Sequence, residues 1–178
     1  MDVTLIVDGA NVMGSRADGW WRDRAGAMAR LHAELAALAV RGIRGPVPGD
    51  RPAPGDGDQP APGDVVDATD EPGPVGAPEA REDNARWYPH VFLVVEGRAR
   101  KMLDLVSSAP AVRVVAARGE GDDEIADLAG RLTGARVVVT ADRELRRRSV
   151  AAGAAVTGPS WLIRQFGYLR AAPAAPSP

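Results

Sequence analysis

Short apolar runs alternate along the chain with longer segments of helical periodicity. An apolar run of three to five residues, bounded by polar or turn residues, is typical of a strand buried on both faces of a parallel sheet. We predict such strands at residues 4–7, 91–95, 112–116, 136–140 and 154–156. The run at 112–116 is less apolar than the others, so we expect it at an edge of the sheet.

The segments between these strands carry apolar residues three or four positions apart, which is the spacing of a helix with one buried face. We predict helices at residues 21–40, 99–107, 122–132, 142–151 and 159–166. Strands that alternate with helices in this way indicate an α/β protein. We therefore expect a three-layer α/β/α sandwich around a central parallel β-sheet.

Residues 45–84 interrupt this alternation. They are rich in Pro, Gly and Asp and contain few large apolar residues, so they cannot bury enough surface to offset the entropy cost of ordering. We predict a single domain over residues 1–170, interrupted by a disordered insertion at about 45–84. The Ala/Pro-rich tail at 171–178 is also expected to be disordered.

The insertion divides the charge of the chain unequally. It holds ten acidic and two basic residues, a net charge of −8, whereas the whole chain carries −2, so the remainder carries +6. A basic body is suited to a phosphate-rich ligand. Solvated arginines distributed by chance would give the same total, so charge alone does not decide the function.

The composition excludes several classes of site. The chain has no cysteine, which excludes disulfides, thiolate metal sites and a cysteine nucleophile. With two histidines, a zinc site of the usual nitrogen and sulfur ligands is not expected. The first residues show no basic segment followed by a long apolar run, so we expect no signal peptide, no membrane span and a cytoplasmic location.

Acidic residues follow four of the predicted strands. They are Asp8 after the first strand, Glu96 after the second, Asp122 and Asp123 beyond the third, and Asp142 after the fourth. Because the carboxyl ends of parallel strands meet at one edge of a sheet, where ligands bind, we expect these side chains to lie close together. Each acid taken alone could instead cap a helix or form a turn. Acids at four strand ends along one edge are better explained by a divalent cation, since Mg²⁺ and Mn²⁺ prefer oxygen ligands and offset the repulsion between carboxylates.

Three motifs lie in these strand-to-helix connections: DGAN at residues 8–11, GDDEI at 121–125 and VTADR at 139–143. In this order and context they resemble the NYN branch of the PIN-like nucleases, and the YacP-type NYN proteins in particular. The resemblance implies a PIN-like fold and a hydrolase that acts as a Mg²⁺- or Mn²⁺-dependent endoribonuclease. It covers residues 1–40 and 90–166 and leaves out the insertion.

The resemblance also implies roles for individual residues. The catalytic residues would be Asp8, Asn11, Glu96, Asp122, Asp123 and Asp142. The metal would be held by Asp8, Asp122 and Asp142, with Asp123 supporting the site directly or through water. Asn11 would orient the loop after the first strand or a water on the metal.

Basic and aromatic residues near the same edge are candidates for substrate binding. Arginine side chains hold phosphates, and we expect this role for Arg16, Arg22, Arg98, Arg118 and Arg143. Trp20 could stack on a base, or it could seal the core under the loop. We expect one of Trp20 and Trp21 to be buried and the other to be available.

The sequence thus predicts a metal-dependent ribonuclease that hydrolyses RNA phosphodiester bonds with metal-activated water. The partner would be single-stranded or structured RNA, and no membrane partner is expected. Whether the chain forms a homo-oligomer is left open. Two alternatives remain open at this stage. The same metal site would serve a nucleotide pyrophosphohydrolase or another small phosphoester hydrolase, and the same scaffold would serve a non-catalytic RNA-binding module.

Overall fold

The computed structural model describes residues 2–48, 86–107 and 109–171. The predicted disordered insertion, apart from residues 45–48, and the predicted tail, apart from residue 171, lie outside these ranges. Within them, none of the helices has the length and hydropathy that a membrane span requires.

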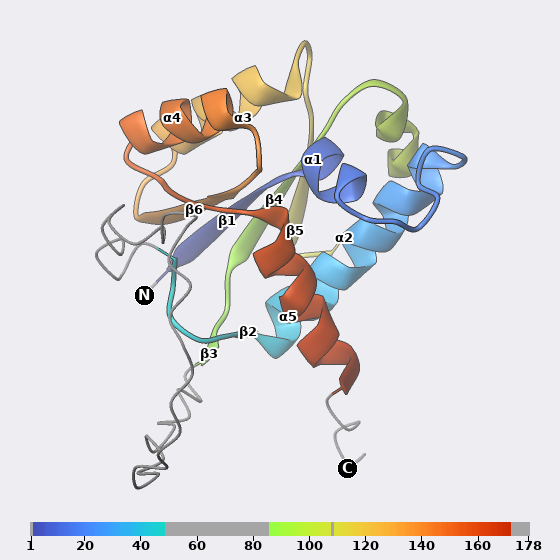
Figure 1. The fold of residues 1–178 in the computed structure, drawn as a ribbon, viewed down its shortest axis with the longest axis horizontal. Coiled ribbons are helices and arrows are strands. Elements are labelled where there is room, and N and C mark those ends of the chain that lie inside the picture. Colours follow the sequence, from blue (N-terminus) through green and yellow to red (C-terminus); the bar gives the residue numbers. More distant parts are fainter. Residues whose placement is uncertain (1, 49–85, 108, 172–178) are drawn as a thin grey trace, which may run out of the picture.

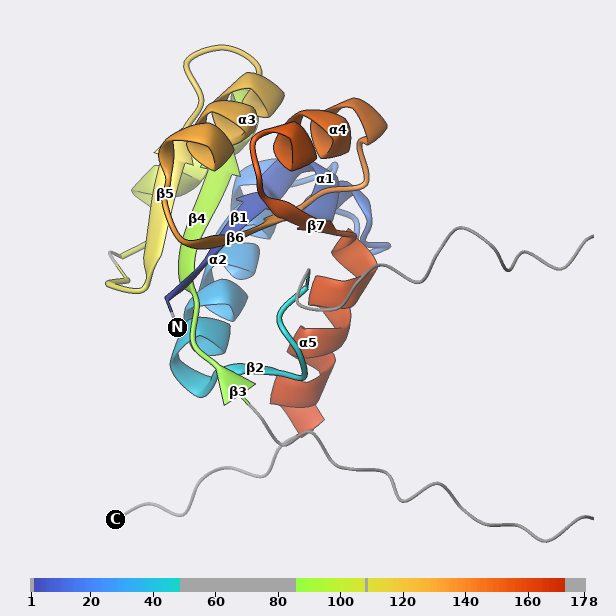
Figure 2. The same cartoon turned by 90° about the vertical axis from the view of Figure 1, so that its left-hand side faces the viewer.

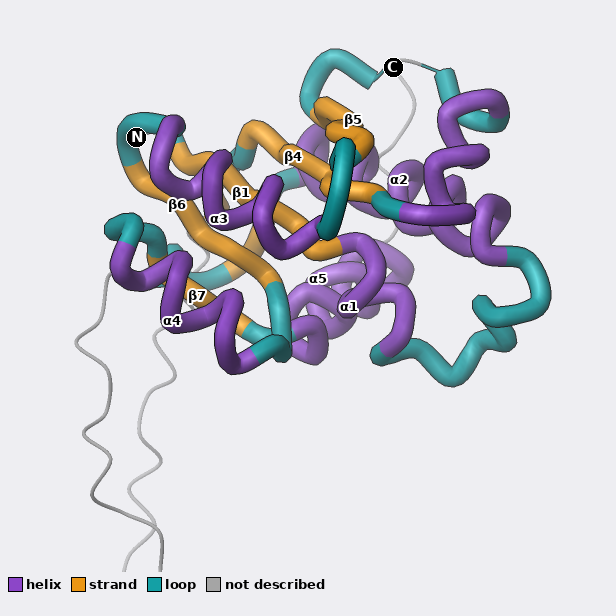
Figure 3. Tube along the Cα trace, turned by 90° about the horizontal axis from the view of Figure 1, so that it is seen from above, coloured by secondary structure: helices purple, strands orange, loops and turns teal. Residues whose placement is uncertain are grey.

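A five-stranded parallel sheet forms the centre of the molecule (Figure 1). Its strands, in chain order, are β1 (Val3–Asp8), β4 (His90–Val95), β5 (Val112–Ala116), β6 (Ala135–Val139) and β7 (Ala155–Thr157). Their order across the sheet is β5-β4-β1-β6-β7 (Figure 3), so β1 is central and β5 lies at an edge, as predicted. All pairs along this sheet are parallel.

Helices cover both faces of the sheet (Figure 2). They are α1 (Gly9–Gly14), α2 (Arg24–Arg41), the 3₁₀ helix η1 (Gly97–Asp104), α3 (Gly121–Arg131), α4 (Arg143–Ala151) and α5 (Pro159–Ala171). Helices α1, α2, η1 and α5 pack on one face, and α3 and α4 on the other. The three-layer α/β/α sandwich around a parallel sheet is therefore confirmed.

Alternating side chains of β1 divide the core between these two faces. Val3, Leu5 and Val7 point to the larger cluster under α2 and α5, and Ile6 points to the smaller one under α3 and α4. All four are at most 1% exposed. A strand buried on both faces needs this continuous apolar run, which is why the first strand was visible in the sequence.

Three features differ from the prediction. The turn after β1 is the short helix α1, and α2 begins at Arg24 rather than at residue 21, since Asp23 caps it by accepting a hydrogen bond from the amide of Gly26 at 2.9 Å. The segment predicted as a helix at 99–107 is 3₁₀ and starts at Gly97. An antiparallel pair, β2 (Ile43–Arg44) with β3 (Arg86–Trp87), was not predicted because two-residue strands have no readable period.

Candidate active site

Asp8 ends the central strand and begins α1. Its Oδ1 accepts a hydrogen bond from the backbone amide of Asn11 at 3.0 Å, and its Oδ2 accepts one from the Thr140 hydroxyl at 2.9 Å. The residue is 6% exposed. The next position requires glycine, because a Cβ on Gly9 would lie 2.7 Å from the Val94 carbonyl oxygen. The chain therefore turns tightly here and holds the Asp8 carboxylate in one place.

The end of β6 is joined to the end of β1 by further hydrogen bonds. The Thr140 Oγ1 accepts a hydrogen bond from the amide of Asp142 at 3.1 Å, and Asn11 Oδ1 accepts one from the amide of Ala141 at 3.0 Å. Asp142 caps α4 by accepting from the amide of Leu145 at 2.7 Å. These contacts lie at the topological switch point of the sheet, where β4 and β6 flank β1 and ligands of α/β proteins bind.

Glu96 connects the end of β4 to the start of α3. Its Oε2 accepts a hydrogen bond from the Gly121 amide at 2.7 Å, whereas Glu120, at the N-cap position, provides no side-chain cap. A Cβ on Gly121 would approach Glu96 Oε2 to 2.9 Å, so glycine allows the carboxylate to come this close. Glu96 thereby fixes the first turn of the helix, and with it the position of Asp122.

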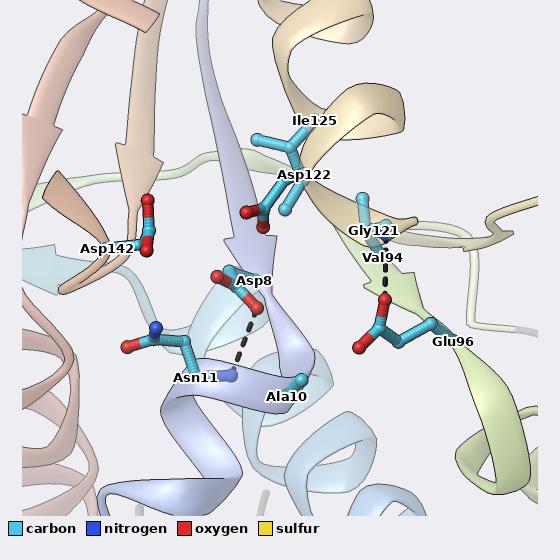
Figure 4. A pocket seen from close by; sticks show the side chains of 9 residues that line it. All are labelled: Asp8, Ala10, Asn11, Val94, Glu96, Gly121, Asp122, Ile125 and Asp142. Carbon is cyan, nitrogen blue, oxygen red and sulfur yellow. Dashed lines mark hydrogen bonds between the residues drawn. The ribbon is translucent and has the colours of Figure 1, made fainter. Parts of the chain in front are cut away.

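These elements enclose one pocket of about 320 Å³ (Figure 4). Four carboxylates and one amide line it: Asp8, Asn11, Glu96, Asp122 and Asp142. The carboxylates of Asp8 and Asp122 face each other across the pocket, and Asp142 and Glu96 approach from opposite sides. Five of the six predicted catalytic residues are thus brought together at the carboxyl edge of the sheet.

The pocket raises the pKa of two of its carboxyls. For Asp8 the main cause is burial, opposed by the hydrogen bonds from Asn11 and Thr140, and the charges of Asp122 and Glu96 raise its pKa further. For Asp122, burial and the charges of Asp142 and Glu96 raise the pKa, while Arg148 lowers it. The acids therefore repel one another in this pocket, as closely placed carboxylates do.

Asp123 is the predicted site residue that the structure does not bring into the pocket. Its carboxylate pairs with Arg148 of α4 at 2.8 Å, and its side chain is 70% exposed. In the described ranges no three Asp, Glu or His side chains are close enough together to form a metal site as they stand. The residues present offer oxygen donors around a pocket, and not a preformed cage.

The predicted phosphate-binding arginines fall into three groups. Arg16 is engaged in the structure, paired with Glu34 at 2.6 Å and stacked on Phe166 at 5.1 Å. Arg22 and Arg98 line a second pocket. Arg118 lies on the connection after β5, Arg143 is the first residue of α4, and both are exposed. Arg16 therefore has a structural partner, and the other four remain candidates.

One of the two tryptophans is partly buried against the core and the other is exposed, but the exposed one is not the predicted ligand. Trp20 packs against the core and lies under Arg24, 5.4 Å from the ring centroid. Trp21 meets it edge-on at 6.2 Å and is 58% exposed. The ring available for stacking is thus Trp21.

Sequence reasoning gave no role to three residues that shape the site. Thr140 bridges Asp8 and Asp142, and its position as a polar residue directly after the apolar run of β6 was a usable signal in the sequence. Gly121 and Arg148 act through contacts with Glu96 and Asp123. Those contacts join residues 25 positions apart, and no local pattern reveals them.

No protein-family model matches the sequence, and no curated protein matches it. Among solved structures, a mutant of Rae1 (YacP) from Bacillus subtilis is similar to this chain, with a TM-score of 0.56 and 16% sequence identity. The alignment covers 96% of this chain and 77% of that one. At this identity the similarity shows the fold. It agrees with the predicted PIN-like fold, and the neighbour bears the name of the group that the three motifs resemble.

Proposed function

We propose that the chain is a Mg²⁺- or Mn²⁺-dependent endoribonuclease whose reaction centre is the carboxylate pocket. The observation that carries the proposal is the convergence of Asp8, Glu96, Asp122 and Asp142 from four different connections onto one pocket at the switch point. The motifs that carry Asp8, Asp122 and Asp142 resemble those of NYN nucleases, and the fold is similar to a protein of the YacP group. Helix capping alone does not require this convergence.

The donor set supports a hydrated divalent cation. The pocket offers carboxylate and amide oxygens and no nitrogen or sulfur donor, which is the chemistry that Mg²⁺ and Mn²⁺ prefer. Mg²⁺ usually keeps several waters and contacts one or two carboxylates directly, so a preformed three-carboxylate cage is not required. When bound, the cation activates a water molecule and neutralises charge that develops on a phosphate.

The protein's own residues have three tasks in this proposal. Asp8, Asp122 and Asp142 would hold the cation, directly or through its waters, and without it their charges would repel a backbone phosphate. The hydrogen bonds from Thr140 and Asn11 keep the Asp8 carboxylate in place. Asp123 acts indirectly: it forms an ion pair with Arg148, and the charge of Arg148 lowers the pKa of Asp122.

The test is cleavage of an end-blocked, single-stranded RNA during a Mn²⁺ titration, with Asp8→Asn and Asp142→Asn beside the wild type. Asn caps a helix as well as Asp does, so both variants keep their helix starts. Asp142→Asn loses only the carboxylate charge, whereas Asp8→Asn also loses one acceptor, because Asp8 accepts from both the Asn11 amide and the Thr140 hydroxyl. We expect cleavage to fall by more than about 100-fold, since even outer-shell partners of a metal are worth about 10–100-fold. Asp127→Asn, an exposed acid of α3 paired with Arg131, is the matched control.

The same assay includes nucleoside triphosphates and thereby separates the rival functions. Hydrolysis of triphosphates with intact RNA would assign the pocket to a pyrophosphohydrolase. RNA binding without any metal-dependent cleavage would assign the chain to a binding module. Full activity in Asp8→Asn and Asp142→Asn would show that the carboxylates serve only as caps.

A further inference from the structure

A second pocket, of about 340 Å³, lies between the start of α2 and the 3₁₀ helix η1. Its charged lining consists of four cations, Arg22, Arg24, Arg98 and Lys101, and one anion, Asp23. The carboxylate of Asp23 is occupied by the amide of Gly26, because it caps α2. The pocket therefore presents a net positive surface, which we call the basic pocket.

The 3₁₀ geometry of η1 places two of these cations side by side. Side chains three positions apart eclipse one another in a 3₁₀ helix, so Arg98 and Lys101 lie on the same face. Arg100, between them, turns inward and donates a hydrogen bond to the Ala117 carbonyl. Among the described residues, no ion pair or side-chain hydrogen bond engages Arg98 or Lys101. The guanidinium group of Arg98 and the ammonium group of Lys101 are therefore available to a ligand.

Trp21 adds an aromatic surface to the same pocket. Its ring is 58% exposed, whereas its neighbour Trp20 packs against the core and supports it edge-on. An exposed indole next to a basic groove is the arrangement with which proteins bind unpaired bases, since a base stacks on the ring while cations hold the backbone.

Residues that line the basic pocket are close neighbours in the sequence of residues that line the carboxylate pocket. Glu96 lines the carboxylate pocket, and Arg98 follows it by two residues, so their Cα atoms lie within about 7 Å of each other. From the other side, α1 begins beside Asp8 and leads into the loop that carries Trp21. Figure 1 shows this loop and η1 together beside the N-terminal end of α2.

We infer that the basic pocket binds single-stranded RNA next to the cleavage site, with a base stacked on Trp21 and phosphates held by Arg22, Arg98 and Lys101. This inference rests on the proposed function, because it names the part of the enzyme that holds the substrate. The combination of an exposed indole with cations fits a nucleic acid better than an acidic peptide, which offers no base to stack.

The test is the affinity for a fluorescein-labelled oligouridylate of about ten nucleotides, measured by anisotropy in EDTA so that no cleavage occurs. We expect Trp21→Ala to weaken binding by about five-fold or more without changing its salt dependence. Arg98→Ala/Lys101→Ala should weaken binding and reduce the slope of log K against log salt by about 1.4, or 0.7 for each phosphate contact. Trp21→Phe, which keeps an aromatic face, should recover most of the lost affinity.

Two matched controls come from other surfaces of the molecule. Tyr88→Ala removes an aromatic side chain that is 60% exposed and precedes β4, at the opposite edge of the sheet. Arg131→Ala/Arg147→Ala removes two exposed arginines, with the same change in charge as the pocket double variant. Both should bind like the wild type. In addition, Lys101 is the one lysine of the sequence, so bound oligonucleotide should protect it from acylation, as read by mass spectrometry.

The outcomes separate the two proposals. Trp21-dependent binding without metal-dependent cleavage would uphold the basic pocket and overturn the nuclease. Cleavage with unchanged binding in the pocket variants would uphold the nuclease and overturn the basic pocket. Equal competition by polyglutamate, or equal losses in the control variants, would also overturn it, because binding would then follow charge alone.

Discussion

At the scale of the residue, capping and site chemistry are carried by the same carboxylates. Asp8 and Asp142 accept the amide hydrogen bonds that start α1 and α4, and both also line the pocket. Helix amides stabilise the charged form of a carboxylate, so a cap is a suitable place to hold a charge in a crowded pocket. The capping interpretation of these acids and the site interpretation are therefore compatible.

Asp122 differs from these two because it has no compensating amide bond, and its replacement should stabilise the fold. Its raised pKa means that the folded state binds more protons than the unfolded state. The contribution of Asp122 to folding stability is therefore full at acid pH and is lost as the pH rises through its pKa in the folded state. We expect Asp122→Asn to raise the free energy of unfolding at pH 7 by up to about 1 kcal/mol, the scale of partly exposed charge interactions. Urea unfolding at several pH values measures this difference.

The gain should disappear below about pH 4, where the wild-type carboxyl is protonated in both states. Added Mn²⁺ should reverse the order, because a cation that binds the folded wild type stabilises it by mass action and the variant has lost a ligand. Asp127→Asn serves as the control from the exposed face of the same helix. A less stable Asp122→Asn at neutral pH would show that Arg148 outweighs the repulsion in this pocket.

At the scale of the element, α3 is started by a side chain from another strand. Glu96→Ala removes the acceptor of the Gly121 amide, so we expect a loss of about 0.5–2 kcal/mol in the free energy of unfolding, as for other helix caps. Hydrogen exchange should rise in the first turn of α3, which carries Asp122. Glu96→Gln keeps an acceptor and should retain most of the protection. Unchanged exchange in Glu96→Ala would mean that the helix start does not depend on this contact.

The sequence predicted the repeating elements because they are long or uniformly apolar. The five strands of the sheet and the helices α2 to α4 were found within three residues, and α5 runs five residues beyond its predicted end. Burial on both faces requires apolar runs, and burial of one face requires helical spacing. Helix α1 has six residues with glycine at both ends, too few for a period. It is held by the Asp8 cap and by the burial of Val12 and Met13.

The candidate site was predictable to the extent that strand ends converge. The strand pattern did not predict the direction of the side chains in the segments that follow the strands. Asp123 lies about 160° around α3 from the buried Ile125 at 100° per residue, and Asp122 only about 60°, so helix phase could have separated the two acids. The difference between Trp20 and Trp21 depends on how one loop packs on the core, and no sequence period encodes it.

At the scale of the whole molecule, the topology determines where the chemistry lies. The chain moves outward from β1 through β4 to β5, then returns across the sheet through α3 to β6 on the other side of β1. The connections that follow β1, β4 and β6 therefore open at one edge, with helices on both faces. The body that surrounds this edge carries the positive charge, whereas residues 45–84 carry the excess of acids.

The pair β2–β3 makes the segment between its strands replaceable. Ile43 pairs with Trp87 and Arg44 with Arg86, so the fold itself holds the two ends of this segment together. We expect a variant with residues 49–85 replaced by a short Gly/Ser linker to keep the circular dichroism of the wild type. Each halving of a loop lowers its closure cost by about 0.6 kcal/mol, so the variant should be about 1–2 kcal/mol more stable. Loss of cooperative unfolding would show that the segment belongs to the folded core.

The same variant tests whether the charge asymmetry matters for RNA. The ten acids of the segment and its two arginines all lie within residues 49–85, so their removal changes the net charge of the chain from −2 to +6. We expect tighter binding of the oligouridylate at low salt, because like charge on the segment no longer repels the phosphates, and a smaller gain as salt screens the charges. A control variant that keeps the length but replaces the ten acids and the two arginines with Asn and Gln has the same net charge of +6 and should bind like the deletion. If the deletion alone bound more tightly, the segment would act by its bulk, and its acidity would have no part in substrate access.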